Sequence, residues 1–298
     1  MNWIASAELA AAVSQAGGLG LISPDAGMAL SGDPVENLRQ QIRKAKSLTD
    51  KPFGVNLPLE RPQIKDLIDA AIEEGISVIV TSVGNPAAYT EYIRQSGVKV
   101  LHVVASVRHA RRAEAEGVDA IIAEGYEAGG HLGFDELPTM VLVPQVVDAV
   151  SKPVVAAGGI ADARGFVAAL ALGAEGVQMG TRFIATHECI AHPNFKQALL
   201  QVSDTGTIVT ARKLGPARVL KSELTTKLLE MEGKGASTEE LLSFIGSGRA
   251  RAGQLAGDFK EGEAYCGAIA GMIKDIISAE EVIGNIVENV PTVLSRLQ

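Results

Sequence analysis

The chain has 298 residues, of which 47% are apolar and 21% charged, a composition typical of a folded globular protein rather than a disordered one. A net charge of −8 at pH 7 argues against nucleic-acid binding, which needs a basic surface to displace counterions from phosphate. The sequence shows neither an apolar run of the roughly 18–20 residues that a membrane span needs nor a secretory leader. Its two cysteines, Cys189 and Cys266, form no C-x-x-C pair. We therefore expect a cytoplasmic protein with reduced thiols and no nucleic-acid or membrane partner.

Short apolar segments alternate with helical patterns over the first two thirds of the chain. Strands are expected at Leu19–Ile22, Phe53–Asn56, Val78–Ser82, Val98–Ala105, Ala120–Glu124, Pro153–Ala157 and Gly176–Met179. Helices between them are expected, for example, at Glu8–Ala16, Ile64–Glu74 and Val107–Glu116, each followed by a glycine. Most strands are apolar without alternation, as in parallel sheets with both faces covered. This regular repeat predicts an α/β protein with a TIM (β/α)8-type barrel rather than an open sheet, because no G-x-G-x-x-G opens the first unit.

Seven strands are one fewer than this barrel needs. The first helix follows Met1–Ala5 directly, so we expect the first barrel strand to lie before Met1; a genuine seven-stranded or rearranged barrel is the alternative. After Phe183 the pattern changes to helices and loops. Amphipathic stretches are seen at Thr238–Ala252, Glu263–Ile277 and Ala279–Leu297. We expect residues 1–185 to form the barrel and residues 186–298 to complete it and add a helical extension packed on it.

The loops after the last two expected strands are rich in glycine. In (β/α)8 barrels these loops often bind phosphate at the catalytic face. They read A-A-G-G-I-A-D at 156–162 and Q-M-G-T-R-F at 178–183. Gly158, Gly159 and Gly180 have no Cβ to keep a phosphate away from backbone N–H groups, and Thr181 can donate a hydroxyl. Glycines also simply end strands, but their presence in both loops favours a phosphate site.

Three polar side chains follow or end other strands on the same face. The amide of Asn56 can donate and accept at once, which suits a heterocycle edge such as a flavin ring, although asparagine is also common in turns. Glu124 ends its strand and, if buried, needs a polar partner. His131 lies seven residues later in a glycine-rich loop. An imidazole there can donate a hydrogen bond or exchange a proton near neutral pH, so His131 is either a reactive group or an ordinary loop histidine.

Other motifs are weaker. The spacing of His187, Cys189 and His192 fits no common zinc pattern, so no metal is expected. The run R-H-A-R-R at 108–112 is expected on a solvated helix face, with docking of an acidic carrier protein as the alternative. G-S-G-R-A-R-A-G at 246–253 is expected to begin a helix, not to bind a nucleotide. Because no Ser-His-Asp or Cys-His arrangement is visible, covalent acyl chemistry is not favoured.

E-A-G-G-H at 127–131, A-A-G-G-I-A-D and Q-M-G-T-R-F together resemble the superfamily of FMN-dependent nitronate monooxygenases (2-nitropropane dioxygenases) and FabK-like enoyl-acyl-carrier-protein reductases II. The similarity runs along almost the whole chain. It implies an FMN-binding barrel with NADH or NADPH as reductant, His131 at the position of the family's active-site histidine, and a homodimer. The implied cofactor-binding residues are Asn56, Glu124, Gly129, Gly158, Gly159, Gln178, Met179, Gly180 and Thr181.

Within the superfamily, A-E-G at 123–125, G-N-P at 84–86 and T-M-V-L-V-P-Q-V at 139–146 resemble the enoyl reductase branch. The resemblance implies hydride transfer from NAD(P)H through FMN to a trans-2-enoyl thioester in fatty acid synthesis, with acyl carrier protein as a partner. His131 would donate a hydrogen bond to the thioester oxygen or supply the α-proton through water. The alternatives are a nitronate monooxygenase that oxidises alkyl nitronates with O₂, and a non-catalytic protein that binds flavin or a phosphate ligand.

Overall fold

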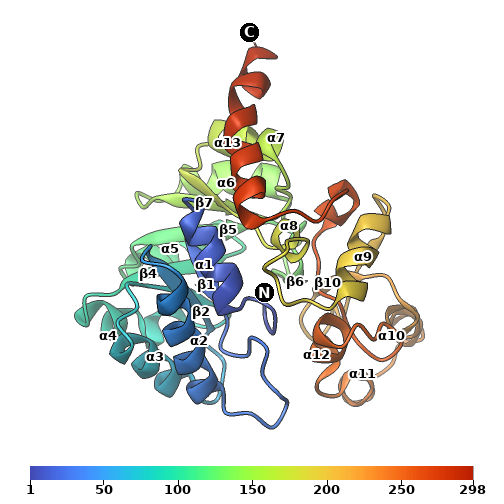
Figure 1. Cartoon of the computed structure of the whole chain (residues 1–298). Coiled ribbons are helices and arrows are strands. Elements are labelled where there is room, and N and C mark those ends of the chain that lie inside the picture. The colour runs from blue at the N-terminus through green and yellow to red at the C-terminus, as the bar shows by residue number, and fades with distance from the viewer. Residues whose placement is uncertain (298) are drawn as a thin grey trace.

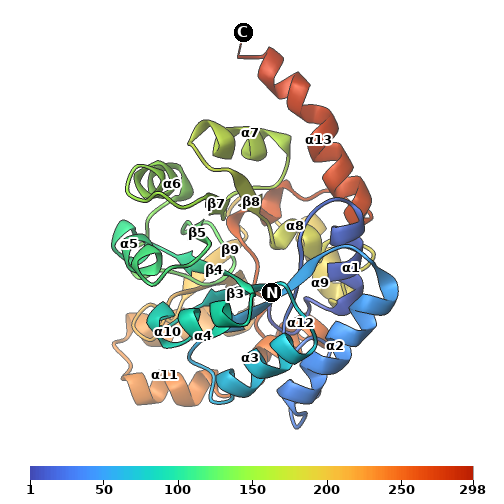
Figure 2. The same cartoon turned by 90° about the vertical axis from the view of Figure 1, so that its left-hand side faces the viewer.

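The computed structural model describes residues 1–297, and its centre is a curled parallel sheet with helices on the outer face (Figures 1 and 2). The order of strands in the sheet follows the chain, as in a TIM barrel. The seven strands are β1 (Gly20–Ile22), β2 (Phe53–Pro58), β3 (Val78–Ser82), β4 (Lys99–Val104), β5 (Ala120–Glu124), β7 (Val154–Ala157) and β8 (Gly176–Gln178). All seven strands predicted from the sequence are therefore present. Within residues 1–297, β1 and β8 are the two edges and do not pair with each other, so the prediction of a barrel short of one strand is confirmed.

Helices follow the strands as the sequence predicts. Those that cover the sheet are α1 (Ala7–Gln15), α2 (Pro34–Leu48), α3 (Ile64–Glu73), η1 (Pro86–Ala88), α4 (Thr90–Gln95), α5 (Val107–Ala115), α6 (Thr139–Val147) and α7 (Ala163–Ala171). Alternate strand residues point to two apolar layers. Ile79 and Ile121 pack outward against the helices, whereas Val80, Ile122 and Ala157 pack inside the curled sheet. Polar residues in the second register therefore face the barrel interior.

One histidine on the outer face of the sheet is buried and has a structural role. His102 of β4 is 4% exposed, and its Nδ1 lies 2.7 Å from Thr81 Oγ1. Burial, reinforced by the charge of His109, lowers the pKa of His102 from 6.5 to about 4. The folded protein therefore holds this imidazole neutral.

Acid should destabilise the fold through His102. Because the unfolded chain binds this proton at higher pH than the folded one, the contribution is complete above pH 6.5 and is lost as the pH falls through about 4. Between pH 7.5 and 4.5 we expect roughly 2–3 kcal/mol of the free energy of unfolding to be lost at this site. Urea unfolding at both pH values measures the loss, which should be smaller by that amount in His102→Gln. Equal losses in both proteins would show that His102 does not titrate as described.

The chain after β8 contains further helices and two strands, which form a second, antiparallel sheet with one earlier strand. The helices are α8 (Thr181–Ile184), α9 (Pro193–Gln201), α10 (Glu223–Gly233), α11 (Thr238–Ile245), α12 (Arg249–Leu255), η2 (Ala268–Met272) and α13 (Ala279–Ser295). The small sheet has the order β6–β10–β9, from β6 (Gly130–His131), β10 (Ala217–Leu220) and β9 (Thr207–Thr210). The prediction of helices and loops alone was incomplete, because strands of two to four residues leave almost no periodic signal.

Two of the three amphipathic stretches need correction. Ala279–Leu297 is confirmed as α13, but Thr238–Ala252 is two helices, because Gly246 and Gly248 adopt positive φ angles of 59° and 81° between them. Glu263–Ile277 is not a continuous helix. Its start runs beside β10, where Leu220 N–H donates to Ala264 O at 2.8 Å, and only η2 is helical. Tertiary pairing therefore overrides the local pattern.

A second apolar cluster joins the barrel to the extension. It combines Ile4 and Phe183 with Cys266 and Ile286 of the C-terminal part. The division at residue 185 stays a prediction, since the two parts share this core. In residues 1–297 no helix combines the length and the apolar character needed to cross a bilayer.

Candidate active site

Three polar side chains project into the curled sheet near the carboxyl ends of its strands. Asn56 alternates with Val55 and Leu57, which pack outward. Glu124 pairs in register with Ala157, and Ala157 with Gln178, so the carboxyl and the second amide lie in one layer. All three polar residues are half-buried, and within residues 1–297 none of these side chains is hydrogen-bonded to another protein group. Asn56, Glu124 and Gln178, which we call the polar trio, therefore share one face with their polar atoms available to a ligand.

Glu124 has an unusual protonation equilibrium. Burial raises its pKa to about 7, against the opposing charge of the amino terminus at Met1. A carboxyl with this pKa is partly protonated near neutral pH, so it can both donate and accept hydrogen bonds. It thus matches a ring edge that presents both kinds of polar atom.

The two glycine loops lie beside this trio and present free N–H groups. Gly158 and Gly159 have φ angles of 87° and 74°, which favour glycine. A Cβ at Gly158 would lie 2.9 Å from Gly125 O. Within residues 1–297 the N–H groups of Gly158, Gly159 and Gly180 donate to no protein acceptor. These donors fit a phosphate, and together with the polar trio the site fits FMN.

Three predicted cofactor-binding residues also contact other parts of the protein. The Thr181 hydroxyl oxygen accepts a hydrogen bond from Gly267 N–H at 2.8 Å, while its own proton remains available to a phosphate. The Met179 side chain packs against both large apolar clusters outside the sheet, so only its backbone is available to a ligand. Gly180 lies against Met1, whose Cγ would be 3.4 Å from a Cβ at that position.

His131 stands at the rim of the site on β6, not in a free loop as the sequence suggested. β6 pairs with β10, with His131 opposite Ala217. The residue is exposed, and its ring centroid lies 5.9 Å from that of Tyr265 at an angle of 56°. Desolvation by the surrounding protein lowers the pKa of His131 below 6.5 although solvent still reaches the ring. This shift favours the neutral imidazole, which offers one N–H donor and one acceptor.

A C-terminal segment, residues 263–268, crosses the mouth of the site; we call it the mouth segment. Ala268 N–H donates to Glu127 O at 2.8 Å, and Gly267 N–H reaches Thr181 as described. A Cβ at Gly129 would lie 2.5 Å from the carbonyl carbon of Cys266, so this glycine permits close packing of the segment. Sequence reasoning missed the mouth segment. The available signal was Gly267, a poor residue for the interior of an expected helix.

The comparisons with known proteins agree with this geometry. A family model described as nitronate monooxygenase matches residues 1–289. The chain belongs to the nitronate monooxygenase family. It is 34% identical over 96% of its length to "(3aS,4S,5R,7aS)-5-hydroxy-7a-methyl-1-oxo-octahydro-1H-indene-4-carboxyl-CoA dehydrogenase" of Mycobacterium tuberculosis, 90% of which is covered. It is 38% identical to a "Probable nitronate monooxygenase" of Staphylococcus saprophyticus over 76% of this chain and 75% of that protein.

A solved structure confirms the fold of this family member. FabK from Thermotoga maritima superposes with a TM-score of 0.92 and 42% identity, covering 100% of this chain and 92% of that one. The TIM-barrel architecture and the assignment as an oxidoreductase are thereby confirmed.

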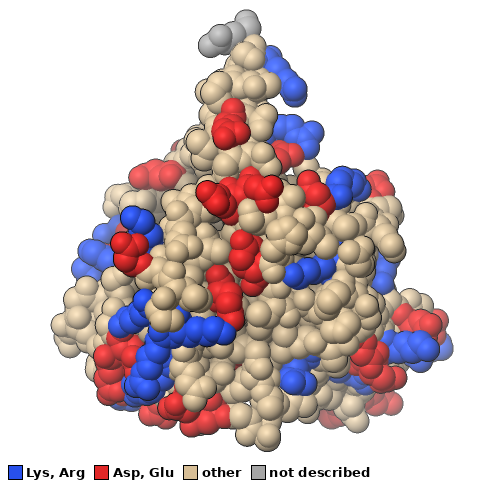
Figure 3. Space-filling view, in the orientation of Figure 1, with Lys and Arg blue, Asp and Glu red and all other residues tan. Residues whose placement is uncertain are grey.

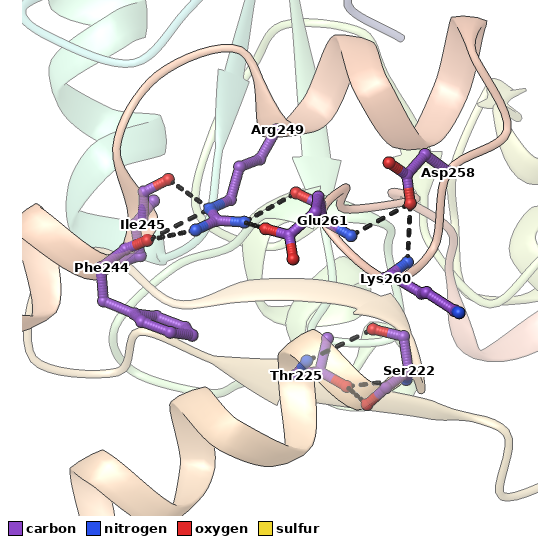
Figure 4. Close-up of polar contacts among 8 residues, drawn as sticks. All are labelled: Ser222, Thr225, Phe244, Ile245, Arg249, Asp258, Lys260 and Glu261. Atoms are coloured by element: carbon purple, nitrogen blue, oxygen red, sulfur yellow. Dashed lines mark hydrogen bonds and ion pairs between the residues drawn. The ribbon is translucent and has the colours of Figure 1, made fainter.

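Arg249, at the start of α12, fixes the approach to the mouth segment (Figure 4). Its guanidinium donates to Phe244 O and Ile245 O, both at 2.7 Å, and to Glu261 O at 2.8 Å. It also lies 5.2 Å from the centre of the Phe244 ring. The end of α11 and the turn before the mouth segment are thus held by one side chain.

Replacement of Arg249 should make the mouth segment more mobile. For Arg249→Ala we expect a loss of about 1–3 kcal/mol in the free energy of unfolding, because three carbonyls, two of them part-buried, lose their charged donor. Amide exchange of residues 263–268 should accelerate at the same time. The matched control is Lys260→Ala nearby, whose side chain makes no hydrogen bond within residues 1–297. Unchanged exchange in the Arg249 variant would contradict this role.

The remaining sequence candidates have structural roles in the family member. His192 accepts from Asn194 N–H at 3.1 Å at the start of α9, and the buried Cys189 lies against Ile4 O. Within residues 1–297 no cluster of three His, Cys, Asp or Glu side chains could hold a metal. The arginines at 108, 111 and 112 are exposed on α5, and 246–253 begins α12 as predicted.

Proposed function

We propose that the protein is an FMN-dependent enoyl-acyl-carrier-protein reductase that uses NADH or NADPH. The observation that favours this branch is Glu124, which ends β5 in A-E-G and turns its carboxyl into the barrel beside Gln178. The structural similarity to FabK supports it. So does the mycobacterial relative, whose name specifies a carboxyl-CoA substrate and hence a thioester. Delivery by acyl carrier protein, a homodimer and a cytoplasmic location are further parts of the proposal.

Different residues would bind the phosphate and the ring of the cofactor. FMN, when bound, would supply the redox chemistry between the nicotinamide and the carbon–carbon double bond. The N–H groups of Gly158, Gly159 and Gly180 would hold its phosphate. Asn56, Glu124 and Gln178 would hydrogen-bond to the polar edge of the ring, near Gly129. These contacts would hold the ring in one orientation.

His131 would act on the substrate at the rim. As the β-carbon of the enoyl thioester is reduced, negative charge develops on the thioester oxygen, where a fixed donor is most effective. The neutral imidazole donates its N–H to that oxygen. The α-carbon then takes its proton from solvent, through a water molecule that the second ring nitrogen positions. The mouth segment, with Tyr265 against the imidazole, orients the ring and limits the access of water.

Nitronate oxidation is the second candidate function. The family description and the staphylococcal relative favour it. His131 would then orient the nitronate or remove its proton, and O₂ would be consumed. The same geometry serves both reactions, because each places an anionic oxygen near the imidazole.

A paired assay separates the candidates. Purified FMN-loaded protein is mixed either with NADH and crotonyl thioester, or with propionate nitronate under air. We expect NADH consumption with the thioester and little oxygen uptake with the nitronate. Oxygen uptake with the nitronate and no use of NADH would make the protein a nitronate monooxygenase. A flavin-containing protein with no turnover on either substrate would be a binding protein.

A further inference from the structure

A groove outside the barrel mouth is lined by none of the residues assigned above to the cofactor or to the substrate. It has a volume of about 410 Å³ and lies between the start of α7, the short α8 and the inner side of α13. Figure 1 shows α13 rising past α7 and projecting beyond the barrel. We call this cavity the α13 groove. Its volume lies within the range typical of small-molecule sites.

The lining of the α13 groove combines an apolar floor with polar groups on one side. Ile273, Ile277 and Ile286 form part of the floor. Asn285, Asn289 and Thr292 line it from α13, four and three residues apart, so they share one face of the helix. Meanwhile Val287 and Leu294 of α13 are exposed at 61% and 45%. The helix therefore turns amide and hydroxyl groups into the groove, as a site for a heterocycle and a sugar requires.

The charge of the groove is opposite to that of the whole protein. Four cationic side chains line it, against two carboxylates: Arg164, Arg182, Lys274 and Arg296, with Asp162 and Asp275. Figure 3 shows basic side chains along the flank of the projecting α13. Arg182 is held by Asp275 at 2.9 Å and Arg164 by Asp162 at 2.5 Å. Within residues 1–297, Lys274 and Arg296 have no carboxylate within 4 Å. They are available to an anionic ligand.

The groove also lies next to the proposed active site along the chain. Ala161 follows the Gly158–Gly159 loop, and Arg182 follows Thr181 directly. Met272, another lining residue, is the last residue of η2. The first residue of η2, Ala268, donates its N–H to Glu127 O beside the mouth. An extended ligand seated in the groove can therefore continue along η2 toward His131.

We propose that the α13 groove binds the phosphorylated adenosine end of a nucleotide cosubstrate. The adenine packs on the apolar floor, and its polar edge and the ribose hydrogen-bond to the amides and hydroxyl of α13. Lys274 and Arg296 pair with the phosphates. Coenzyme A thioesters and pyridine dinucleotides share this chemistry. The inference rests on the proposed function only in that the reaction uses such a cosubstrate.

Calorimetric titration of the FMN-loaded protein tests the groove without turnover. Adenosine 3′,5′-bisphosphate represents the coenzyme A end and ADP-ribose the dinucleotide end. We expect one of them to bind with 1:1 stoichiometry, and the double variant Lys274→Ala, Arg296→Ala to weaken it at least about tenfold, since two charged contacts are lost. Arg108→Ala, Arg111→Ala on α5 is the matched control for charge and should leave the affinity within about twofold. Both replaced pairs are exposed, so folding is preserved.

The measurements test ligand binding in the α13 groove and the proposed reaction separately. Absence of binding by both nucleotides, or equal affinity in the double variant, would overturn the groove assignment. The reaction itself is followed with crotonyl-N-acetylcysteamine, a thioester with no nucleotide. If it is not reduced while nucleotide binding persists, the proposed function fails and the groove stands. If the groove takes the coenzyme A end, the double variant should raise KM for crotonyl-CoA and leave KM for the truncated thioester unchanged.

Discussion

Replacing His131 with alanine is expected to lower kcat for an enoyl thioester about 10²–10³-fold while FMN stays bound. The ring is exposed at the rim on β6, so its removal takes away the hydrogen-bond donor without opening the core. The measurements are steady-state kcat and the visible flavin absorption of the purified variant. A partial recovery is expected in His131→Gln, whose amide can still donate.

The matched control for His131 is His109→Ala, because His109 is an exposed histidine on α5. It should leave kcat unchanged. Loss of flavin from His131→Ala, with normal turnover after reconstitution, would mean that this histidine holds the cofactor and does not act on the substrate.

Gly129→Ala should displace the mouth segment and lower both stability and turnover. The new Cβ would lie 2.5 Å from the carbonyl carbon of Cys266 and 2.6 Å from Gly267 N, and backbone atoms cannot rotate away. We expect a loss of about 1–3 kcal/mol in the free energy of unfolding, the usual effect of overpacking. A loss of at least about tenfold in kcat should accompany it, because the segment supports the His131 ring through Tyr265.

Gly284→Ala in α13 is the control for Gly129. A Cβ there meets no atom within 4 Å, and alanine is the better helix former, so stability should be unchanged or slightly higher. Urea unfolding and kcat are measured for both variants. Wild-type turnover in Gly129→Ala would show that the mouth segment does not support the site.

The repeating part of the fold was predictable from the sequence. Strands buried on both faces have uniform apolar runs, and the rule that parallel strands end at one face placed Asn56, Glu124 and the glycine loops together. Their assembly in the structure follows from register, such as Glu124 with Ala157 and Ala157 with Gln178. None of this required knowledge of contacts between distant segments.

The mouth segment and β6, which the sequence did not reveal, depend on contacts between distant segments. The mouth segment is held by β10, by Glu127 O and by the Thr181 hydroxyl, none of which is near it in sequence. Its apolar residues resemble a helix face, yet they pack between the E-A-G-G-H loop and the Q-M-G-T-R-F loop. Likewise β6 is a strand only because β10 pairs with it. Local periodicity holds no information on these pairings.

The central proposal is that electrons from NADH reach an enoyl thioester at this site. The most direct measurement is anaerobic: FMN-loaded protein is reduced with one equivalent of NADH, and crotonyl thioester is added without O₂ while the visible flavin absorption is followed. We predict that the absorption of oxidised flavin returns and that butyryl thioester forms in equal amount. Flavin that stays reduced with the thioester, and is reoxidised only when air is admitted, would contradict the proposal.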